Sequence, residues 1–196
     1  MTARFTRLGE AVVGWMPVLP AAASGARSEP AVLAGRDILA EAVALTGGPP
    51  TVIHSSCAVC GSTGHGAPRT ASGVTQVSVA YAPGLVVVAA APTRAVAAIG
   101  VDVEIDRAGL LNELAGLFAP ALPPDTRRWT QLEAALKVDG RGVRVPPERV
   151  VVRSASGRTV ADVPGGPVGI ELLDVDGPAG FCISLALARP HPIHAM

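Results

Sequence analysis

The 196-residue sequence predicts an α+β protein built from two similar halves. Two stretches carry this prediction: residues 77–92 and 170–190 each look like a β-hairpin with proline and glycine at the turn. Each hairpin closes in a run of small aliphatic residues followed by a proline, and each is preceded by a segment with helical periodicity. We place the boundary between an N-terminal half, residues 1–98, and a C-terminal half, residues 99–196.

The first half begins with an expected strand over residues 11–18, followed by a loop rich in alanine, glycine and proline. Val32, Leu39 and Val43 lie at helical spacing, which predicts a helix over residues 31–45 that ends at the glycines and prolines from Gly47 onward. Residues 54–73 show no periodicity and are expected to form a long loop. The hairpin strands are expected at residues 74–80 and 85–91.

The second half repeats the order of strand, helix and hairpin. Asp125 is a candidate N-cap for its longer helix, and Asp139 and Gly140 end that helix. The expected elements are a strand at 99–105, helices at 110–118 and 126–138, and strands at 149–153, 168–175 and 181–188.

Composition excludes several classes of function. Sixteen basic residues balance sixteen acidic ones, so the chain lacks the basic field of a nucleic-acid-binding protein or of a polybasic membrane contact. The apolar run at residues 85–91 is far shorter than the roughly 20 residues of a membrane span. The three cysteines do not suggest a disulfide framework, and Glu10 interrupts a weakly signal-like N-terminus, so we expect a cytoplasmic protein.

Two acids in the strand GVDVE could bind a metal ion. Strand alternation places Asp102 and Glu104 on one face, opposite Val101 and Val103. Neighbouring carboxylates resist burial unless a cation neutralises them, and hard oxygen ligands suit Mg²⁺. The alternative is a solvated strand edge with two exposed acids.

A second candidate group lies on the helix at 126–138. Trp129, Glu133 and Lys137 follow one another at four-residue spacing and so share one helical stripe. An acid and a base on one face could serve catalysis, or they could form an ordinary surface pair beside a core tryptophan.

In this order, "IGVDVE" and "WTQLEAALKVDGRG" resemble the motifs of the 4'-phosphopantetheinyl transferases of the surfactin-synthetase-activating type. In that family, G(V/I)D(V/I)E is followed by WxxKExxxK. The loop "CAVCGSTGHGAP" looks like the CxxCGxxHGKP loop of actinobacterial members, and "GRDILAEAVAL" like their first helix. The resemblance covers roughly residues 30–190.

The resemblance implies two similar α/β halves that pack as an intramolecular pseudo-dimer, with coenzyme A and Mg²⁺ bound between them. A serine hydroxyl of an acyl or peptidyl carrier protein attacks the β-phosphate of coenzyme A and releases 3',5'-ADP. Asp102, Glu104 and Glu133 would hold the metal, Glu133 is also a candidate general base, and Lys137 would contact the diphosphate. The residues expected at the coenzyme are Arg36, His65, Gly66, Pro68, Arg69, Tyr81 and Lys137.

Three residues depart from the family pattern. Ala67 replaces the lysine of HGKP, Tyr81 replaces the histidine of the hairpin, and Leu132 replaces the lysine of WxxKE. Each change removes a charge-assisted phosphate contact worth about 1.5 to 3 kcal/mol. Tyr81 can still donate one hydrogen bond, and we expect it to face the cleft between the halves.

Two other functions therefore stay open: a homologue repurposed for a small-molecule intermediate in natural-product biosynthesis, and a non-catalytic accessory protein that binds carrier proteins. A zinc knuckle at Cys57, Cys60 and His65, with His54 nearby, is a further alternative, although a second well-spaced ligand pair is absent. The expected partner is a carrier protein rather than a nucleic acid or membrane, and the expected state is a monomer.

Overall fold

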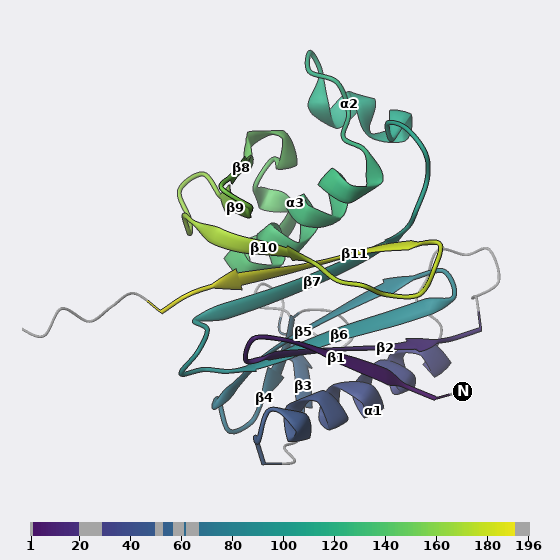
Figure 1. Ribbon diagram of the computed structural model, residues 1–196, viewed down its shortest axis with the longest axis vertical. Coiled ribbons are helices and arrows are strands. Elements are labelled where there is room, and N and C mark those ends of the chain that lie inside the picture. Colours follow the sequence, from purple (N-terminus) through teal and green to yellow (C-terminus); the bar gives the residue numbers. More distant parts are fainter. Residues whose placement is uncertain (1, 20–28, 50–52, 57–60, 62–66, 191–196) are drawn as a thin grey trace, which may run out of the picture.

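Four layers stack in the protein, two antiparallel sheets inside and a helix on each outer side (Figure 1). The computed structural model describes residues 2–19, 29–49, 53–56, 61 and 67–190. Helix α1 (Glu29–Leu45) covers the first sheet and helix α3 (Thr126–Asp139) covers the second. The described residues contain three α-helices, of which α2 (Ala115–Phe118) has only one turn. The fold is therefore mixed α and β, as predicted.

The first sheet has four strands in the order β1-β2-β6-β5, and all of them lie before residue 98. A separate two-stranded pair, β3 with β4, lies beside β5. The strands are β1 (Arg4–Leu8), β2 (Ala11–Pro17), β3 (Ile53–Ser56), β4 (Ala67–Thr70), β5 (Thr75–Ala82) and β6 (Leu85–Pro92). All eight residues of β6 are buried, because β6 is a central strand with α1 on one face and the second sheet on the other.

The second sheet has five strands in the order β7-β11-β10-β9-β8, all of them after residue 97. Short 3₁₀ turns flank α2 and α3, at Asn112–Leu114, Gly142–Arg144 and Pro147–Arg149. The strands are β7 (Ala98–Ile105), β8 (Val151–Ala155), β9 (Arg158–Asp162), β10 (Ile170–Asp174) and β11 (Phe181–Ala188).

The two sheets share one pattern of connections. In the first, the chain passes from β2 through α1 to the hairpin β5–β6, and the last strand lies between the other two in the order β2-β6-β5. In the second, it passes from β7 through α3 to the hairpin β10–β11, in the order β7-β11-β10. The helix packs on the equivalent strands in both cases, α1 on β2 and β6 and α3 on β7 and β11. The two hairpins thus occupy the same place in each sheet.

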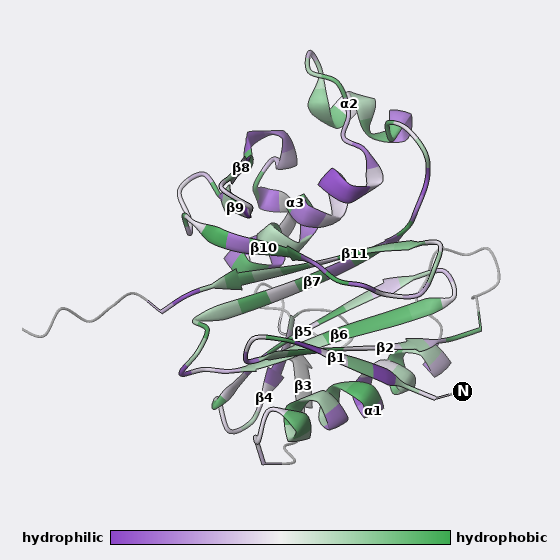
Figure 2. Ribbon diagram, viewed as in Figure 1, coloured by the Kyte–Doolittle hydropathy of each residue, from purple (hydrophilic) through white to green (hydrophobic). Residues whose placement is uncertain are grey.

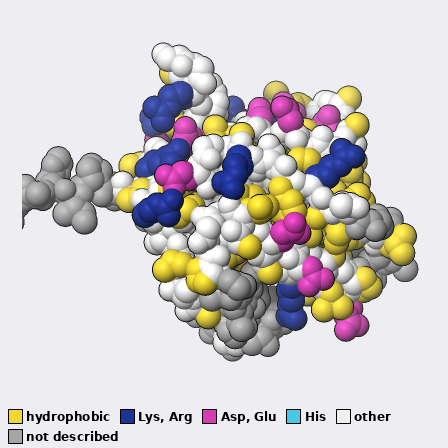
Figure 3. Space-filling model, turned by 60° about the horizontal axis from the view of Figure 1, so that its bottom comes forward, with side chains coloured by type: hydrophobic (Ala, Val, Ile, Leu, Met, Phe, Trp, Pro, Cys, Tyr) yellow, Lys and Arg dark blue, Asp and Glu magenta, His cyan; other side chains and the backbone are white. Residues whose placement is uncertain are grey.

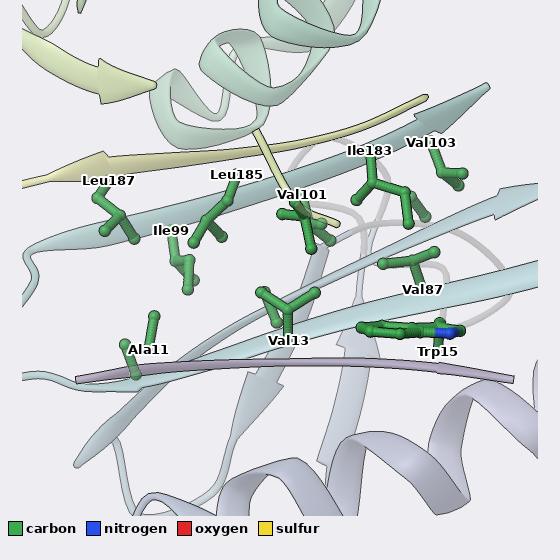
Figure 4. Packing of buried hydrophobic residues seen from close by; sticks show 14 of the residues in the cluster. Ala11, Val13, Trp15, Val87, Ile99, Val101, Val103, Ile183, Leu185 and Leu187 are labelled. Atoms are coloured by element: carbon green, nitrogen blue, oxygen red, sulfur yellow. The ribbon is translucent and has the colours of Figure 1, made fainter. Parts of the chain in front are cut away.

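An apolar core joins the two sheets. Val13, Trp15 and Val87 from the first sheet face Val101 and Ile183 from the second (Figure 4). Each sheet also packs against its helix through one further apolar cluster. The strands are largely hydrophobic, whereas α3 also carries polar residues (Figure 2). On the face shown in Figure 3, acidic and basic side chains are interspersed, in keeping with the zero net charge.

Some expected elements were wrong. The expected loop at 54–73 contains most of β3 and the whole of β4, two short strands that satisfy each other's backbone groups. The expected helix at 110–118 is reduced to a 3₁₀ turn and one α-helical turn, where Gly116 and Pro120 disfavour a longer helix. Strands β1 and β9, both rich in polar residues, were not predicted at all. Among the described residues, no helix is both long and apolar enough to cross a bilayer.

Candidate functional site

The candidate site lies where α3 runs along β7. Two residues of a strand advance about 6.6 Å, and four residues of a helix advance about 6 Å, so alternate strand residues can match every fourth helix residue. Gly100 allows the close approach: a Cβ atom built there would stand 2.1 Å from the carbonyl oxygen of Ala134. The glycine of GVDVE therefore seats the helix against the strand that carries the two acids.

Lys137 is the cation of this site, and it is the only lysine in the sequence. Its Nζ donates one hydrogen bond of 2.8 Å to Asp102 Oδ1 and another of 2.8 Å to the carbonyl oxygen of Val101. The Asp102 side chain is only 11% exposed and that of Lys137 31%. The expected stripe on α3 thus points toward the acids of β7.

Asp102 has one oxygen without a partner. Its Oδ2 is buried and makes no hydrogen bond to any described residue. Burial raises the pKa of Asp102 above its ordinary value, and the Lys137 charge opposes that shift only in part. An unsatisfied buried carboxylate oxygen is costly, so a cation or a proton at Oδ2 would stabilise the group.

Glu104 and Glu133 complete the acidic group. Burial raises the pKa of both side chains, and the charge on Asp102 raises each further. Glu104 also repels Glu133, which means that all three carboxyl groups lie within electrostatic reach of one another. Arg107 and Trp129 oppose the shift at Glu104, and Lys137 opposes it at both glutamates.

The charge balance of this group favours a divalent cation. With all groups ionised, the three carboxylates and the Lys137 ammonium carry a net charge of −2, and Arg107 offsets part of it at Glu104. The unpartnered Oδ2 and the mutual repulsion fit Mg²⁺, which prefers carboxylate oxygens. In the part of the chain that the structure describes, no three His, Cys, Asp or Glu side chains already stand together as metal ligands. The magnesium site at Asp102, Glu104 and Glu133 stays a prediction.

Buried hydroxyl groups link β7 to the elements around it. Ser184 pairs with Asp102 across β7 and β11, and its Oγ lies 2.8 Å from Thr130 Oγ on α3. On the other edge of β7, the Val101 N–H donates to Ser78 Oγ of β5 over 3.0 Å, which ties the first sheet to the strand of the acids. A pocket of about 120 Å³, lined in part by Glu104, Arg107 and Trp129, opens beside Glu104.

Tyr81 does not face the second sheet. Alternation along β5 turns Ser78 and Ala80 toward the second sheet and turns Tyr81 toward α1, where it packs against the outer apolar cluster. Its hydroxyl lies over Gly35, where a Cβ atom would come within 2.6 Å of the oxygen. The expectation that Tyr81 faces the cleft between the halves is therefore wrong.

The remaining expected coenzyme residues belong to the first half. Arg36 on α1 and Arg69 on β4 are exposed, and Pro68 is half-buried. Helix α1 packs on the outer face of the first sheet, so Arg36 lies on the opposite side of that sheet from α3 (Figure 1). His65, Gly66, Cys57 and Cys60 lie outside the described residues, as does the side chain of His54, so the zinc alternative is not tested.

Leu132 lies in an apolar environment. It is 3% exposed and packs in the core between α3 and the second sheet, rather than on the stripe of Trp129, Glu133 and Lys137. Leucine at this position thus contributes to the core and places no charge near Asp102.

The chain matches no protein-family model, and no curated protein shows significant sequence similarity to it.

Sequence reasoning missed Gly100, Ser184 and Thr130 as parts of the site. The glycine could have been noticed, because a glycine inside a strand pattern signals close backbone approach. Ser184 and Thr130 gave no such signal, since their roles depend on strand register and helix docking.

Proposed function

We propose that this chain is a Mg²⁺-dependent 4'-phosphopantetheinyl transferase, which moves the 4'-phosphopantetheine arm of coenzyme A to a serine of an acyl or peptidyl carrier protein. The supporting observation is the buried Asp102 carboxylate, with one oxygen on Lys137 and the other unpartnered, electrostatically coupled to Glu104 and Glu133. This arrangement joins two motifs that lie more than 20 residues apart in the sequence.

In this proposal, Asp102, Glu104 and Glu133 would hold Mg²⁺, which would neutralise part of the charge on the diphosphate of coenzyme A. Glu133 accepts the proton of the attacking serine hydroxyl as the new bond to the β-phosphorus forms. The bond from phosphorus to the bridging oxygen breaks, and 3',5'-ADP leaves with that oxygen.

Lys137 has two tasks in the proposal. In the free protein its ammonium partly neutralises Asp102. In the working complex it contacts the diphosphate and stabilises the negative charge on the leaving group. Its side chain is 31% exposed, which gives the ammonium a route from the carboxylate to a bound phosphate.

We also propose that the two halves form an intramolecular pseudo-dimer with coenzyme A between them. The shared order of strand, helix and hairpin in the two sheets supports this arrangement. The hydrogen bond from Val101 to Ser78 supports it as well, because it links the candidate metal strand to the first half. With this arrangement we expect the protein to act as a monomer on a carrier protein in the cytoplasm.

A repurposed homologue is the second candidate, and one pair of observations favours it. Tyr81 packs on α1 and Leu132 in the core, so neither residue places a charge or donor where the family carries a phosphate contact. Such a protein would keep the acidic site and act on a small-molecule intermediate without coenzyme A.

Intact-mass spectrometry of an apo carrier protein tests the proposal. Incubation with this protein, coenzyme A and Mg²⁺ should add the mass of phosphopantetheine to the carrier. Glu133→Gln should abolish the gain, whereas Glu41→Gln, a matched change at an exposed glutamate of α1, should leave it unchanged. No gain with the wild type, under conditions in which an authentic transferase modifies the same carrier, would favour the repurposed candidate.

A further inference from the structure

A second pocket lies beside α3, at the β8 edge of the second sheet. It has a volume of about 310 Å³ and lies between α2, α3, the turn Pro147–Arg149 and strand β8. Seven of its nine lining residues are apolar by type: Phe118, Leu122, Pro124, Leu132, Pro147, Val150 and Val152. The volume is at the lower end of the roughly 300 to 1,000 Å³ of small-molecule sites.

Arg128 brings an unsatisfied charge to this pocket. Its backbone N–H donates to the capping carboxylate of Asp125 over 2.7 Å, which fixes the residue in the first turn of α3. The guanidinium Nη1 is buried and has no hydrogen-bond partner among the described residues. A buried donor left unpaired costs about 1 to 3 kcal/mol, so a turn of the guanidinium toward an acceptor in the pocket would be favourable.

Other arginines of the second half contrast with Arg128. Arg127 pairs with Asp174, and Arg153 pairs with Asp162. For Arg128, no ion pair with a described acidic residue is formed within 4.0 Å, although Glu148 lines the same pocket. Glu148 is exposed and adds one negative charge at the pocket. A dianion would meet this repulsion more strongly than a monoanion would.

We propose that this pocket binds a small organic monocarboxylate with an apolar body. The carboxylate accepts hydrogen bonds from the Arg128 guanidinium. The apolar body packs against Leu122 and Val152, the more exposed apolar residues of the lining, with the buried Phe118, Leu132 and Val150 beneath them. Charge complementarity sets the head group, and the apolar lining sets the rest of the ligand.

This site is separate from the carboxylate group on β7. Neighbouring residues of a helix point about 100° apart, which turns Leu132 into the pocket while Glu133 approaches Asp102. Binding of a monocarboxylate at this pocket is independent of the proposed transfer reaction.

Hexanoate is the probe, titrated into ¹⁵N-labelled protein and followed by NMR. We expect saturable shifts at the amides of residues around Phe118, Arg128 and Val150. Hexylammonium and hexan-1-ol have the same apolar body without the carboxylate, and both should bind at least tenfold more weakly. Equal binding of all three, or shifts outside the pocket only, would overturn the proposal.

Variants test the role assigned to Arg128. Arg128→Met should weaken hexanoate binding about tenfold to hundredfold, since a charge-assisted hydrogen bond is lost. Arg128→Lys should keep part of the affinity. Because it retains the charge, it is the control for a loss of affinity that comes from misfolding. Arg149→Met makes the same charge change at an exposed neighbour outside the lining and should alter affinity less than twofold. Glu148→Gln should tighten binding, and unchanged affinity in Arg128→Met would overturn the assignment.

Discussion

Replacing Lys137 by methionine isolates the electrostatics of the candidate site. Methionine keeps most of the apolar stem that lies against β7 but removes the ammonium that donates to Asp102 Oδ1 and to the Val101 carbonyl oxygen. Asp102 would then keep its negative charge in a buried position with neither oxygen on a cation. The metal-free protein should lose stability for this reason.

The size of the loss follows from burial. Removing one partner of a fully buried ion pair costs about 3 to 5 kcal/mol. The Lys137 side chain is 31% exposed and that of Asp102 11%, so water compensates part of the loss and we expect about 2 to 4 kcal/mol. For a domain of this size, that corresponds to a fall in Tm of about 4 to 16 °C.

Thermal unfolding in EDTA, with and without added Mg²⁺, measures the effect. Mg²⁺ should restore more stability to Lys137→Met than to the wild type, because the cation replaces the missing charge. The double variant with Asp102→Asn should regain much of the loss, since the buried charge itself is gone. Arg94→Met breaks an exposed pair with Glu10, whose side chains are 74% and 54% exposed, and should cost no more than about 1 kcal/mol. A Lys137→Met protein as stable as the wild type in EDTA would refute the reasoning.

Three further predictions concern the same elements. The folded-state pKa of Asp102 lies above its ordinary value of 3.8, so the stabilising contribution of Asp102 is complete below pH 3.8 and is lost as the pH rises through the raised pKa. In EDTA, the unfolding free energy of the wild type relative to Asp102→Asn should therefore fall from pH 4 to pH 7. A difference that stays constant over this range would contradict the prediction. Gly100→Ala should destabilise by about 1 to 3 kcal/mol in urea unfolding, because the new Cβ meets the Ala134 carbonyl oxygen, whereas Gly116→Ala, with no atom within 4 Å, should not destabilise. Asp125→Ala should cost about 1 kcal/mol by the same measurement, because the side chain accepts the Arg128 N–H, and Asp125→Asn, which keeps an accepting oxygen, should cost clearly less.

The strongest local patterns predicted the fold well. The β6 run of valine and alanine and the alternating residues of β5 predicted a hairpin that the structure has at Thr75–Ala82 and Leu85–Pro92. Helix α3 begins after Asp125 and ends at Gly140, whose φ of 79° suits glycine, as the capping residues predicted. Strands β3 and β4 could not be predicted, because each has four residues and depends on pairing with the other.

For the site, too, some features follow from local sequence and others depend on contacts between distant parts of the chain. Alternation in GVDVE and the four-residue spacing on α3 depend on neighbours in sequence. The ion pair between Asp102 and Lys137 was not predicted, because it depends on how α3 docks on β7. The orientation of Tyr81 follows from alternation along β5, which turns Ala80 toward the second sheet and Tyr81 toward α1. The Arg128 pocket depends on how α2, Pro147–Arg149 and β8 pack around α3, and no local pattern predicts that packing.

Binding of Mn²⁺, followed by the loss of the free-ion signal in electron paramagnetic resonance, tests most directly whether Asp102 and its neighbours form a metal site. We predict one ion per chain, strong weakening of binding in Asp102→Asn and Glu133→Gln, and no change in the matched variant Glu41→Gln. Binding that survives both site substitutions, or no binding by the wild type at millimolar Mn²⁺ with coenzyme A present, would contradict the account.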